Sequence, residues 1–251
     1  MEPALVTERR GRVVILRIQR EKKRNAIDRE TALAIDAALN ALEDDPGLRV
    51  GVITGTDSIF SAGTDLKDGR DARTERGGEY GVIRRRRSKP LIAAVEGAAL
   101  GGGFEIVLAC DLVVASSTAR FGLPEGLRGV MPTSGGLFRA PRALPRMIAN
   151  QLMLTGESLL PLRAFELGLV NELVEPGQAV GRAVELAERI CRSAPTSVAQ
   201  ILTRQQDLIA DDEARGWEAT AAAVEVVLAS DDMKEGVTAF FEKRPPAWPG
   251  S

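Results

Sequence analysis

The sequence predicts an α/β fold followed by a helical C-terminal region, and three observations support this class. Short, nearly continuous apolar runs have the composition of strands buried in a sheet. A helical pattern separates the first two runs, which gives the strand–helix–strand order of an α/β unit. Beyond residue 161 the pattern is mostly helical, and we assign residues 1–195 to a core and residues 196–251 to a helical region. The predicted strands are residues 12–19, 50–54, 91–95 and 112–115, with a shorter one at 170–174.

Capping residues and breakers set the expected helix boundaries. Asp28 is predicted to cap a helix that runs to about Asp44, before the breaker Pro46-Gly47. Further along the chain, Gly168 marks a helix end and Pro195 marks a helix start. The other expected helices are residues 104–109, one that follows Gly135-Gly136, and residues 144–154, 163–167, 180–191, 213–228 and 231–241.

Charge and composition restrict the possible functions. The 251 residues are 44% hydrophobic with a net charge of −2, which favours neither nucleic acid nor a membrane as a partner. No apolar run approaches a membrane span and the first residues lack a signal peptide's apolar core, so we expect a cytoplasmic protein. The chain has no histidine, which excludes histidine-based triads and histidine zinc sites. Acid–base chemistry is left mainly to carboxylates, lysine, tyrosine or cysteine, and Cys110 and Cys191 are expected to be buried free thiols.

Two polar segments are harder to interpret. Residues 67–80 are polar and glycine-rich, and we expect them to be mobile or partly helical. The run Arg84-Arg85-Arg86-Arg87 is typical of a solvated helix face, and contact with phosphate is the alternative.

The most informative stretch is residues 95–111, where a buried strand leads through Gly101-Gly102-Gly103 into an apolar helix. Glycine allows a backbone to approach a ligand closely, and a helix start offers free N–H groups that can hold an oxygen that becomes anionic. Glu105 lies in the first turn of that helix, in an otherwise apolar run where a carboxylate is costly to bury. A tight strand-to-helix turn with an acidic residue at its start explains the same pattern without any ligand.

A second glycine-containing loop and a second carboxylate extend this pattern. Ser61-Ala62-Gly63-Thr64 also follows a buried strand, and Glu125 lies on a loop or a short helix start after Pro124. Paired N–H donors and two carboxylates suit chemistry next to a carbonyl group. Sequence spacing alone does not show that these groups meet in space.

The chain closely resembles the crotonase family, also called the enoyl-CoA hydratase/isomerase superfamily, over nearly its whole length. The resemblance implies a crotonase-like fold of repeated ββα units, with a C-terminal helical region that forms trimers or dimers of trimers. It also implies a lyase that hydrates a 2-enoyl-CoA in fatty acid metabolism, with CoA as part of the substrate and no separate cofactor or metal. The motifs that carry the resemblance are residues 60–67 and 95–111 for the two oxyanion-hole segments, 121–136 for the catalytic loop, and 164–171 and 241–246 for later segments.

The resemblance assigns roles to individual residues. The backbone N–H groups of Thr64 and Gly102 are expected to bind the thioester oxygen, and Glu105 and Glu125 match the two hydratase glutamates. CoA is expected along the first basic loop and near a C-terminal helix, where Arg244 is a further candidate. The implied substrate-binding residues are Lys22, Arg24, Ala26, Ala62, Thr64, Asp65, Leu66, Lys67, Gly101, Gly102, Pro132 and Lys243.

Two departures from the family pattern leave alternatives open. Thr64 stands where alanine is common, and Thr133-Ser134 replaces a small-residue pair, which predicts an altered acyl pocket. The run from Ser134 to Arg139 is similar to the crotonobetainyl-CoA hydratase branch. The alternatives to 2-enoyl-CoA hydration are a double-bond isomerase, another crotonase-family reaction such as crotonobetainyl-CoA hydration, and a non-catalytic acyl-CoA-binding protein. The presence of both glutamates favours hydration.

Overall fold

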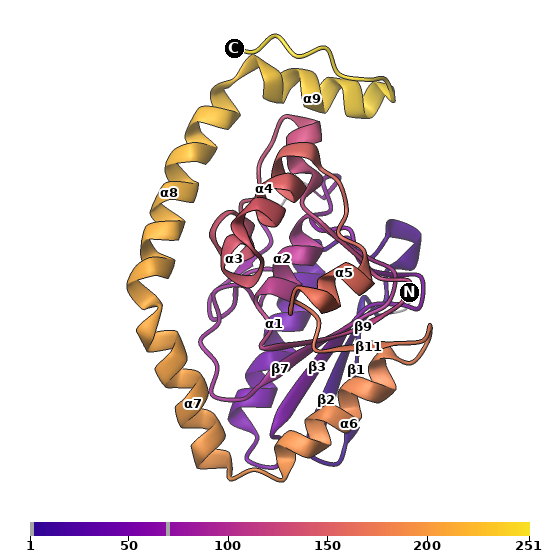
Figure 1. The fold of residues 1–251 in the computed structure, drawn as a ribbon, viewed down its shortest axis with the longest axis vertical. Helices are drawn as coiled ribbons and strands as arrows, with labels where there is room; N and C mark the ends of the chain where they lie inside the picture. Colours follow the sequence, from indigo (N-terminus) through magenta and orange to yellow (C-terminus); the bar gives the residue numbers. More distant parts are fainter. Residues whose placement is uncertain (1–2, 69–70) are drawn as a thin grey trace.

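The computed structural model describes residues 3–68 and 71–251, and within them it has a layered α/β core and a helical arm (Figure 1). The main sheet has the order β1-β2-β3-β7-β9-β11, with β1 antiparallel to β2 and all other pairs parallel. The predicted α/β class and each of the predicted strands are confirmed. The six strands are β1 (Leu5–Arg10), β2 (Val13–Ile18), β3 (Val50–Thr54), β7 (Leu91–Val95), β9 (Leu112–Ser116) and β11 (Glu172–Val174).

Helices cover both faces of this sheet because its central strands are apolar on both sides. Helix α1 (Arg29–Asp44) buries Ile35, Leu39 and Leu42 on one face, and the Asp28 side chain caps it by accepting a hydrogen bond from the Thr31 N–H. Helix α6 (Ala179–Cys191) packs on the opposite face against β3, β7 and β9. Strand β11 and α6 follow residue 161 but belong to this layered core, where Cys110 and Cys191 are half-buried free thiols rather than fully buried ones.

A second, smaller sheet carries the loops of interest. It consists of three short parallel strands in the order β10-β8-β4, with β8 in the middle. Helix α2 (Gly102–Leu108) follows β8 directly, and its Phe104 and Ile106 are fully buried in the main hydrophobic core. The three strands are β4 (Ile59–Ser61), β8 (Ala98–Leu100) and β10 (Arg120–Gly122).

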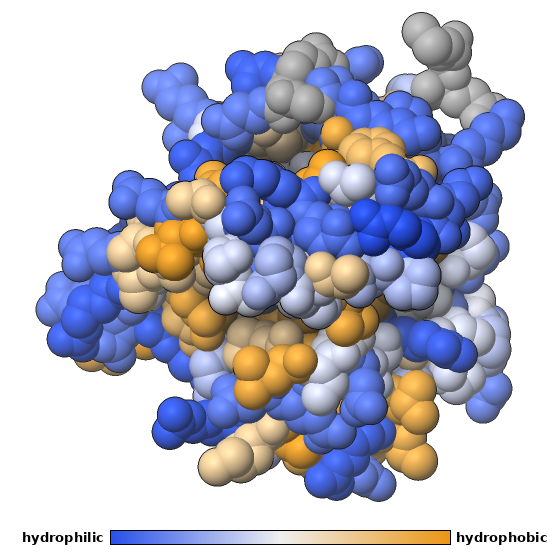
Figure 2. All heavy atoms as spheres, turned by 90° about the horizontal axis from the view of Figure 1, so that it is seen from above, coloured by the Kyte–Doolittle hydropathy of each residue, from blue (hydrophilic) through white to orange (hydrophobic). Residues whose placement is uncertain are grey.

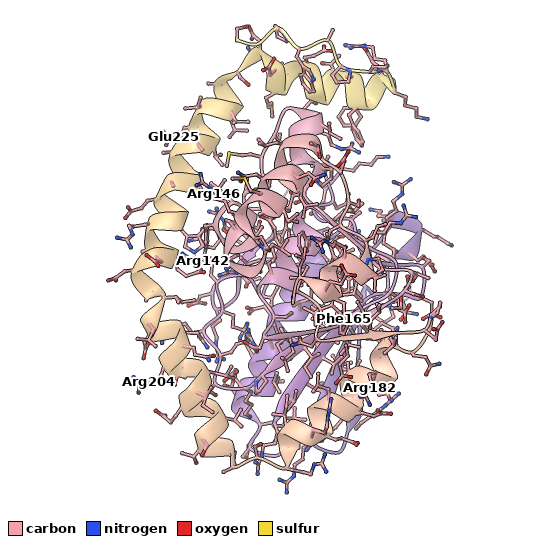
Figure 3. The ribbon with its side chains drawn as sticks, viewed as in Figure 1. Arg142, Arg146, Phe165, Arg182, Arg204 and Glu225 are labelled. Carbon is pink, nitrogen blue, oxygen red and sulfur yellow. The ribbon has the colours of Figure 1, made fainter. Side chains whose placement is uncertain are left out.

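The C-terminal helices form an arm around the core. In Figure 1, α7 (Pro195–Leu208) and α8 (Ala210–Ala229) run along one side of the molecule, and α9 (Asp231–Glu242) crosses the top. Side chains from α3 (Gly136–Ala143) join the arm to the core, since Arg139 and Arg142 both form ion pairs with Glu213 of α8. In Figure 3, Arg142 lies between α3 and the arm. The remaining elements are α4 (Arg146–Thr155), α5 (Pro161–Glu166) and the 3-10 helices η1 (Glu21–Lys23) and η2 (Pro124–Arg128).

The expectation that residues 67–80 are partly helical is wrong where the structure describes them, and the alternative that they are mobile stays a prediction. Residues 69 and 70 lie outside the described residues, and the rest contains a two-stranded antiparallel hairpin of β5 (Arg73–Thr74) and β6 (Gly78–Glu79). Glycines 77 and 78 allow this hairpin, because a Cβ at Gly77 would lie 2.6 Å from the Cα of Gly81, and Gly78 has φ of +66°.

The arginine run is neither a solvated helix face nor an array of free cations. Each of its four guanidinium groups has a carboxylate partner within the chain, and Arg85 and Arg87 are buried. Arg87 binds Asp111 and also donates to the Ala109 carbonyl at 2.8 Å, which ties the start of β7 to the end of α2. The other three ion pairs are Arg84–Glu79, Arg85–Asp36 and Arg86–Asp207.

Candidate active site

Three loops meet at one edge of the small sheet because its strands are parallel. The carboxyl ends of β4, β8 and β10 point to the same side, so the residues that follow these strands become neighbours. Thr64 follows β4, Gly102 follows β8 and Glu125 follows β10. The fold thus brings together three of the four predicted catalytic residues, and α2 adds the fourth, Glu105.

The Thr64 and Gly102 N–H groups are free to bind a ligand oxygen. Ile27 pairs with the first loop by donating to Gly63 O and accepting from Asp65 N, which leaves the Thr64 N–H between them unused. Gly102 begins α2, so its N–H has no carbonyl partner within the helix. Among the described residues neither group donates a backbone hydrogen bond.

Glycine is required where the two loops approach each other. Gly63 has φ of +89°, and a Cβ there would lie 2.7 Å from the Gly102 nitrogen. Gly101 has φ of +54°, and its N–H donates to Gly122 O at 2.9 Å, which links β8 to β10. A side chain at Gly63 would therefore displace one of the two candidate donors.

Glu105 is a buried carboxylate that the backbone holds in place. Its Oε1 atom accepts hydrogen bonds from the Ser134 N–H at 2.7 Å and from the Gly136 N–H at 2.8 Å. A Cβ at Gly136 would lie 3.0 Å from the same oxygen, so the glycine allows this approach. Both donors bind Oε1, which leaves Oε2 free of them.

Glu125 lies opposite on η2 with fewer partners. A Cβ built on Gly101 would lie 3.3 Å from Glu125 Oε1, which places this carboxylate directly beside the glycine turn. Its Oε2 atom is buried and has no hydrogen-bond partner among the described residues. An orphaned buried carboxylate oxygen costs free energy unless the group is protonated or a ligand approaches it.

The two carboxyl groups have raised pKa values for different reasons. Burial raises the pKa of Glu105 to about 7, although the two backbone donors favour its charged form. Burial, followed by the charge of Glu105, raises the pKa of Glu125 to about 8. Near neutral pH this arrangement favours one ionised and one protonated carboxyl group, with the proton on Glu125.

The sequence did not reveal Tyr80 as part of this site, whereas it did single out Ser134 as a residue that alters the acyl pocket. Tyr80 is the only tyrosine in the chain, and its hydroxyl lies 2.7 Å from Thr64 Oγ1. Burial and the charge of Glu105 raise the pKa of Tyr80, while the side chains of Thr64 and Ser134 favour its ionised form through hydrogen bonding. The sequence did contain a feature that could have identified Tyr80. Without histidine, tyrosine is one of the few acid–base groups left, and the only tyrosine lies between Gly78 and Gly81.

The predicted CoA-binding residues gather along the first loop, and one of them has a structural role. The Ala62 N–H donates to Arg24 O at 3.0 Å, so the basic loop and the β4 loop run side by side. Asp65 is buried and forms ion pairs with Arg20 and Lys23, which occupies its carboxylate within the protein. The other residues of this group are exposed or half-buried: Lys22, Arg24, Ala26, Ala62, Leu66 and Lys67.

Two further predicted residues lie elsewhere. Pro132 is buried beside Gly136, within the loop that binds Glu105. Lys243 is exposed at the end of α9, and Arg244 next to it forms ion pairs with Glu235 and Glu242. Among the described residues no hydrogen bond or ion pair connects Lys243 or Arg244 to the first loop.

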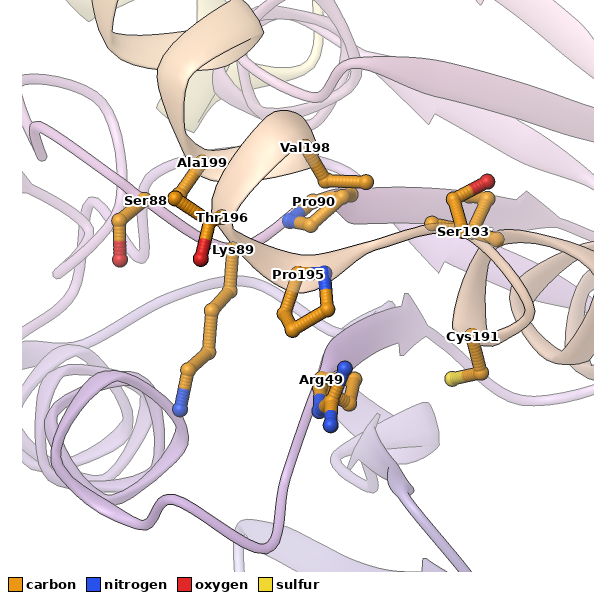
Figure 4. A pocket seen from close by; sticks show the side chains of 11 residues that line it. Arg49, Ser88, Lys89, Pro90, Cys191, Ser193, Pro195, Thr196, Val198 and Ala199 are labelled. Atoms are coloured by element: carbon orange, nitrogen blue, oxygen red, sulfur yellow. The ribbon is translucent and has the colours of Figure 1, made fainter.

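The cavity shown in Figure 4 is separate from these loops. It has a volume of about 320 Å³ and lies where the start of α7 meets the β7 approach, between Lys89, Pro195 and Cys191 (Figure 4). None of the predicted catalytic residues lines it. Within residues 3–68 and 71–251 the structure has neither a cluster of acidic and cysteine side chains that could hold a metal ion nor a helix suited to crossing a membrane.

Comparisons with known proteins agree with this geometry. A family model described as enoyl-CoA hydratase/isomerase matches residues 8–251. Carnitinyl-CoA dehydratase from Salmonella arizonae is 38% identical over 261 aligned positions, which cover 100% of both chains. Mevalonyl-coenzyme A hydratase sidH from Aspergillus fumigatus is 40% identical over 94% of this chain and 91% of its own length. The crystal structure of carnitinyl-CoA hydratase from Mycobacterium avium matches with a TM-score of 0.94 and 40% identity over 100% of both chains.

Proposed function

Because the chain belongs to the enoyl-CoA hydratase/isomerase family, we propose that it adds water across the 2,3 double bond of a 2-enoyl-CoA thioester. The family, the fold class and the hydro-lyase class that the sequence predicts are confirmed by the relatives and solved structures above. The observation that carries the detailed proposal is the pair of glutamates, Glu105 and Glu125, beside two free N–H groups.

In the proposed mechanism the thioester oxygen lies between the N–H groups of Thr64 and Gly102. Addition of water to C3 shifts charge onto this oxygen, and donors that are already in place stabilise it without reorganisation. Loss of one such donor typically lowers the rate about 10²- to 10³-fold. The free state of both N–H groups supports this role.

The two glutamates divide the proton transfers. Ionised Glu105, whose Oε1 is held by two N–H groups, accepts a proton from water as the water oxygen bonds to C3. Protonated Glu125 delivers a proton to C2, which completes the addition of one water molecule. The two N–H donors on Glu105 favour its ionised form, and the buried Glu125 Oε2 without a partner among the described residues favours protonation there, which supports this assignment.

A panel of enoyl-CoA thioesters tests the activity. Loss of the conjugated thioester absorbance is followed with crotonyl-CoA, longer and branched enoyl-CoAs, and crotonobetainyl-CoA, which the names of two relatives make a specific candidate. Separate Glu105→Gln and Glu125→Gln variants are expected to lose hydration, and Glu125→Gln also loses solvent deuterium exchange at C2. Near-normal hydration by either variant contradicts the two-carboxylate mechanism, and a wild-type protein that moves double bonds without hydrating supports the isomerase alternative.

The wider assignment includes an assembly. Viewed from above, the surface is mostly hydrophilic with separate apolar patches (Figure 2), and several large apolar side chains of the helical arm are exposed. We propose that these side chains meet a second copy of the chain in a trimer or a dimer of trimers, which sedimentation at micromolar concentration tests. A cytoplasmic location and independence from any cofactor besides the CoA of the substrate also remain predictions. The exposed residues are Ile201, Leu208, Val226, Leu228, Phe240 and Phe241.

A further inference from the structure

Tyr80 is held in an unusual conformation that turns its ring into the site. The residue has φ of +56°, which is rare for a side chain other than glycine, asparagine or aspartate and costs on the order of 1–3 kcal/mol. The hairpin fixes it, because the Tyr80 N–H donates to Ala72 O at 3.1 Å and its neighbour Gly81 packs against α1. Only 5% of the residue is exposed.

The phenol oxygen touches both halves of the proposed oxyanion hole. It lies 2.7 Å from Thr64 Oγ1 on one side. On the other side, a Cβ built on Gly102 would overlap the same oxygen and lie 2.6 Å from the ring carbon Cζ. A Cβ is about 2.5 Å from the nitrogen of its own residue, so the phenol oxygen lies within about 5 Å of the Gly102 nitrogen. At that separation, an acceptor that lies between the two atoms, about 2.9 Å from the Gly102 nitrogen, is also within hydrogen-bond distance of the phenol oxygen.

The surroundings keep the phenol protonated and leave its hydrogen available. Burial and the charges of Glu105 and Glu125 all raise the pKa of Tyr80, so the group is a donor throughout the pH range of the reaction. A phenol oxygen accepts up to two hydrogen bonds and donates one. The hydroxyl groups of Thr64 and Ser134 are its two polar neighbours, and both can donate to it. When both hydroxyl groups donate to the phenol oxygen, the phenol hydrogen is available to an acceptor in the site.

We infer that Tyr80 is a third hydrogen-bond donor to the thioester oxygen, alongside the N–H groups of Thr64 and Gly102. The inference rests on the proposed function for the identity of that oxygen. The sequence predicts an oxyanion hole made of backbone donors only. The inference adds a side chain, that of Tyr80, to these donors.

The test measures carbonyl polarisation separately from turnover. The probe is 2,4-hexadienoyl-CoA, a conjugated thioester whose absorption moves to longer wavelength when donors polarise its carbonyl group. Tyr80→Phe removes only the hydroxyl group, and Thr64→Val removes the hydroxyl partner of Tyr80 but keeps the backbone N–H. The dissociation constant and the absorption shift of the bound probe are measured for wild type, each single variant and the double variant. Binding of butyryl-CoA to each protein checks that the site is intact.

We expect Tyr80→Phe to bind the probe within about threefold of wild type, with a clearly smaller absorption shift and a kcat for hydration lowered about 10²-fold. Thr64→Val is expected to retain most of the absorption shift, because it keeps the backbone N–H that belongs to the hole. An unchanged shift in Tyr80→Phe overturns the inference. It is equally overturned if Thr64→Val reproduces the loss and the double variant adds nothing, because Tyr80 then acts only through Thr64.

The same experiment separates this inference from the proposed function. A wild-type protein that hydrates no enoyl-CoA, but whose probe shift depends on Tyr80, refutes the hydratase proposal and supports the third donor. A wild-type protein that hydrates enoyl-CoA with a probe shift independent of Tyr80 refutes the third donor alone.

Discussion

Replacement of Glu125 by glutamine should change how the stability of the protein depends on pH. Burial and the charge of Glu105 raise the pKa of Glu125 from 4.5 to about 8, so the folded state binds its proton more tightly than the unfolded state does. Each pKa unit corresponds to about 1.4 kcal/mol, and the full difference corresponds to about 5 kcal/mol. Solvent screening of this partly exposed side chain reduces the expected contribution to about 2–4 kcal/mol.

The sign of the effect follows from the raised pKa. The contribution is fully present below the unfolded value of 4.5 and is lost as the pH rises through about 8. Between pH 5 and 8 the free energy of unfolding of wild type should fall by about 2–4 kcal/mol relative to that of Glu125→Gln.

Urea unfolding at fixed protein concentration and ionic strength measures this difference at several pH values. Glu75→Gln, a variant at an exposed glutamate of the hairpin, serves as the control and should follow wild type at every pH. The reasoning is refuted if Glu125→Gln also follows wild type across this range, because Glu125 then ionises near its ordinary pKa.

Three further predictions follow from packing and charge. Gly63→Ala should lower kcat/KM about 10²- to 10³-fold because its Cβ would displace a donor of the hole. Gly177→Ala, at a residue with φ of +80° and no atom within 4 Å of the added Cβ, should leave kcat/KM unchanged. Equal losses in the two variants would point to backbone strain as the cause. Arg87→Met should lower the free energy of unfolding by about 3–5 kcal/mol, because the Asp111 carboxylate loses its ion pair. Arg86→Met, at a side chain that is 63% exposed, should change it by less than about 0.5 kcal/mol. Urea unfolding measures both changes. Lys22→Ala should weaken acyl-CoA binding a few-fold in calorimetry, more at low salt than at high salt, and a loss independent of salt would argue against a phosphate contact.

Much of the fold could be predicted because long apolar runs and capping residues leave strong local signals. The strand at residues 91–95 is fully buried on both faces, as its composition predicted, and Asp28 caps α1 as expected. The catalytic candidates could be selected for a similar reason. A carboxylate such as Glu105 within an apolar helix is costly to bury, and glycine runs mark close approaches of the backbone.

The small sheet could not be predicted, although it assembles the site. Its strands, β4, β8 and β10, have three residues each and lack the length that period-based patterns need. Both outer strands pair with β8, which joins residues as far apart as Ile59 and Ala98, and only this pairing brings the loops of Thr64 and Glu125 to the same edge.

The role of Tyr80 was not predicted and the arginine run was interpreted wrongly as a solvated helix face, because both depend on distant partners. The position of Tyr80 follows from a hairpin whose strands have two residues each, and from a positive φ that no propensity rule predicts for tyrosine. Arg85 and Arg87 look like solvated charges in the sequence but are buried, because Asp36 and Asp111 approach them from other elements.

The contact between α9 and η2 packs the segment that carries Glu125 against residues more than one hundred positions later. The two backbones touch closely, since a Cβ at Gly236 would lie 2.5 Å from the carbonyl carbon of Arg128, and the Arg128 guanidinium stacks on Phe240 with its central carbon 4.6 Å from the ring centroid. A ribosome-bound chain that has emerged only as far as α8 already contains both glutamates and both glycine loops, but it lacks the helix that packs against η2, the segment that carries Glu125. A chain stopped there, or trimmed back to that point by a protease, keeps every catalytic candidate while losing a packing partner of the segment that holds one of them.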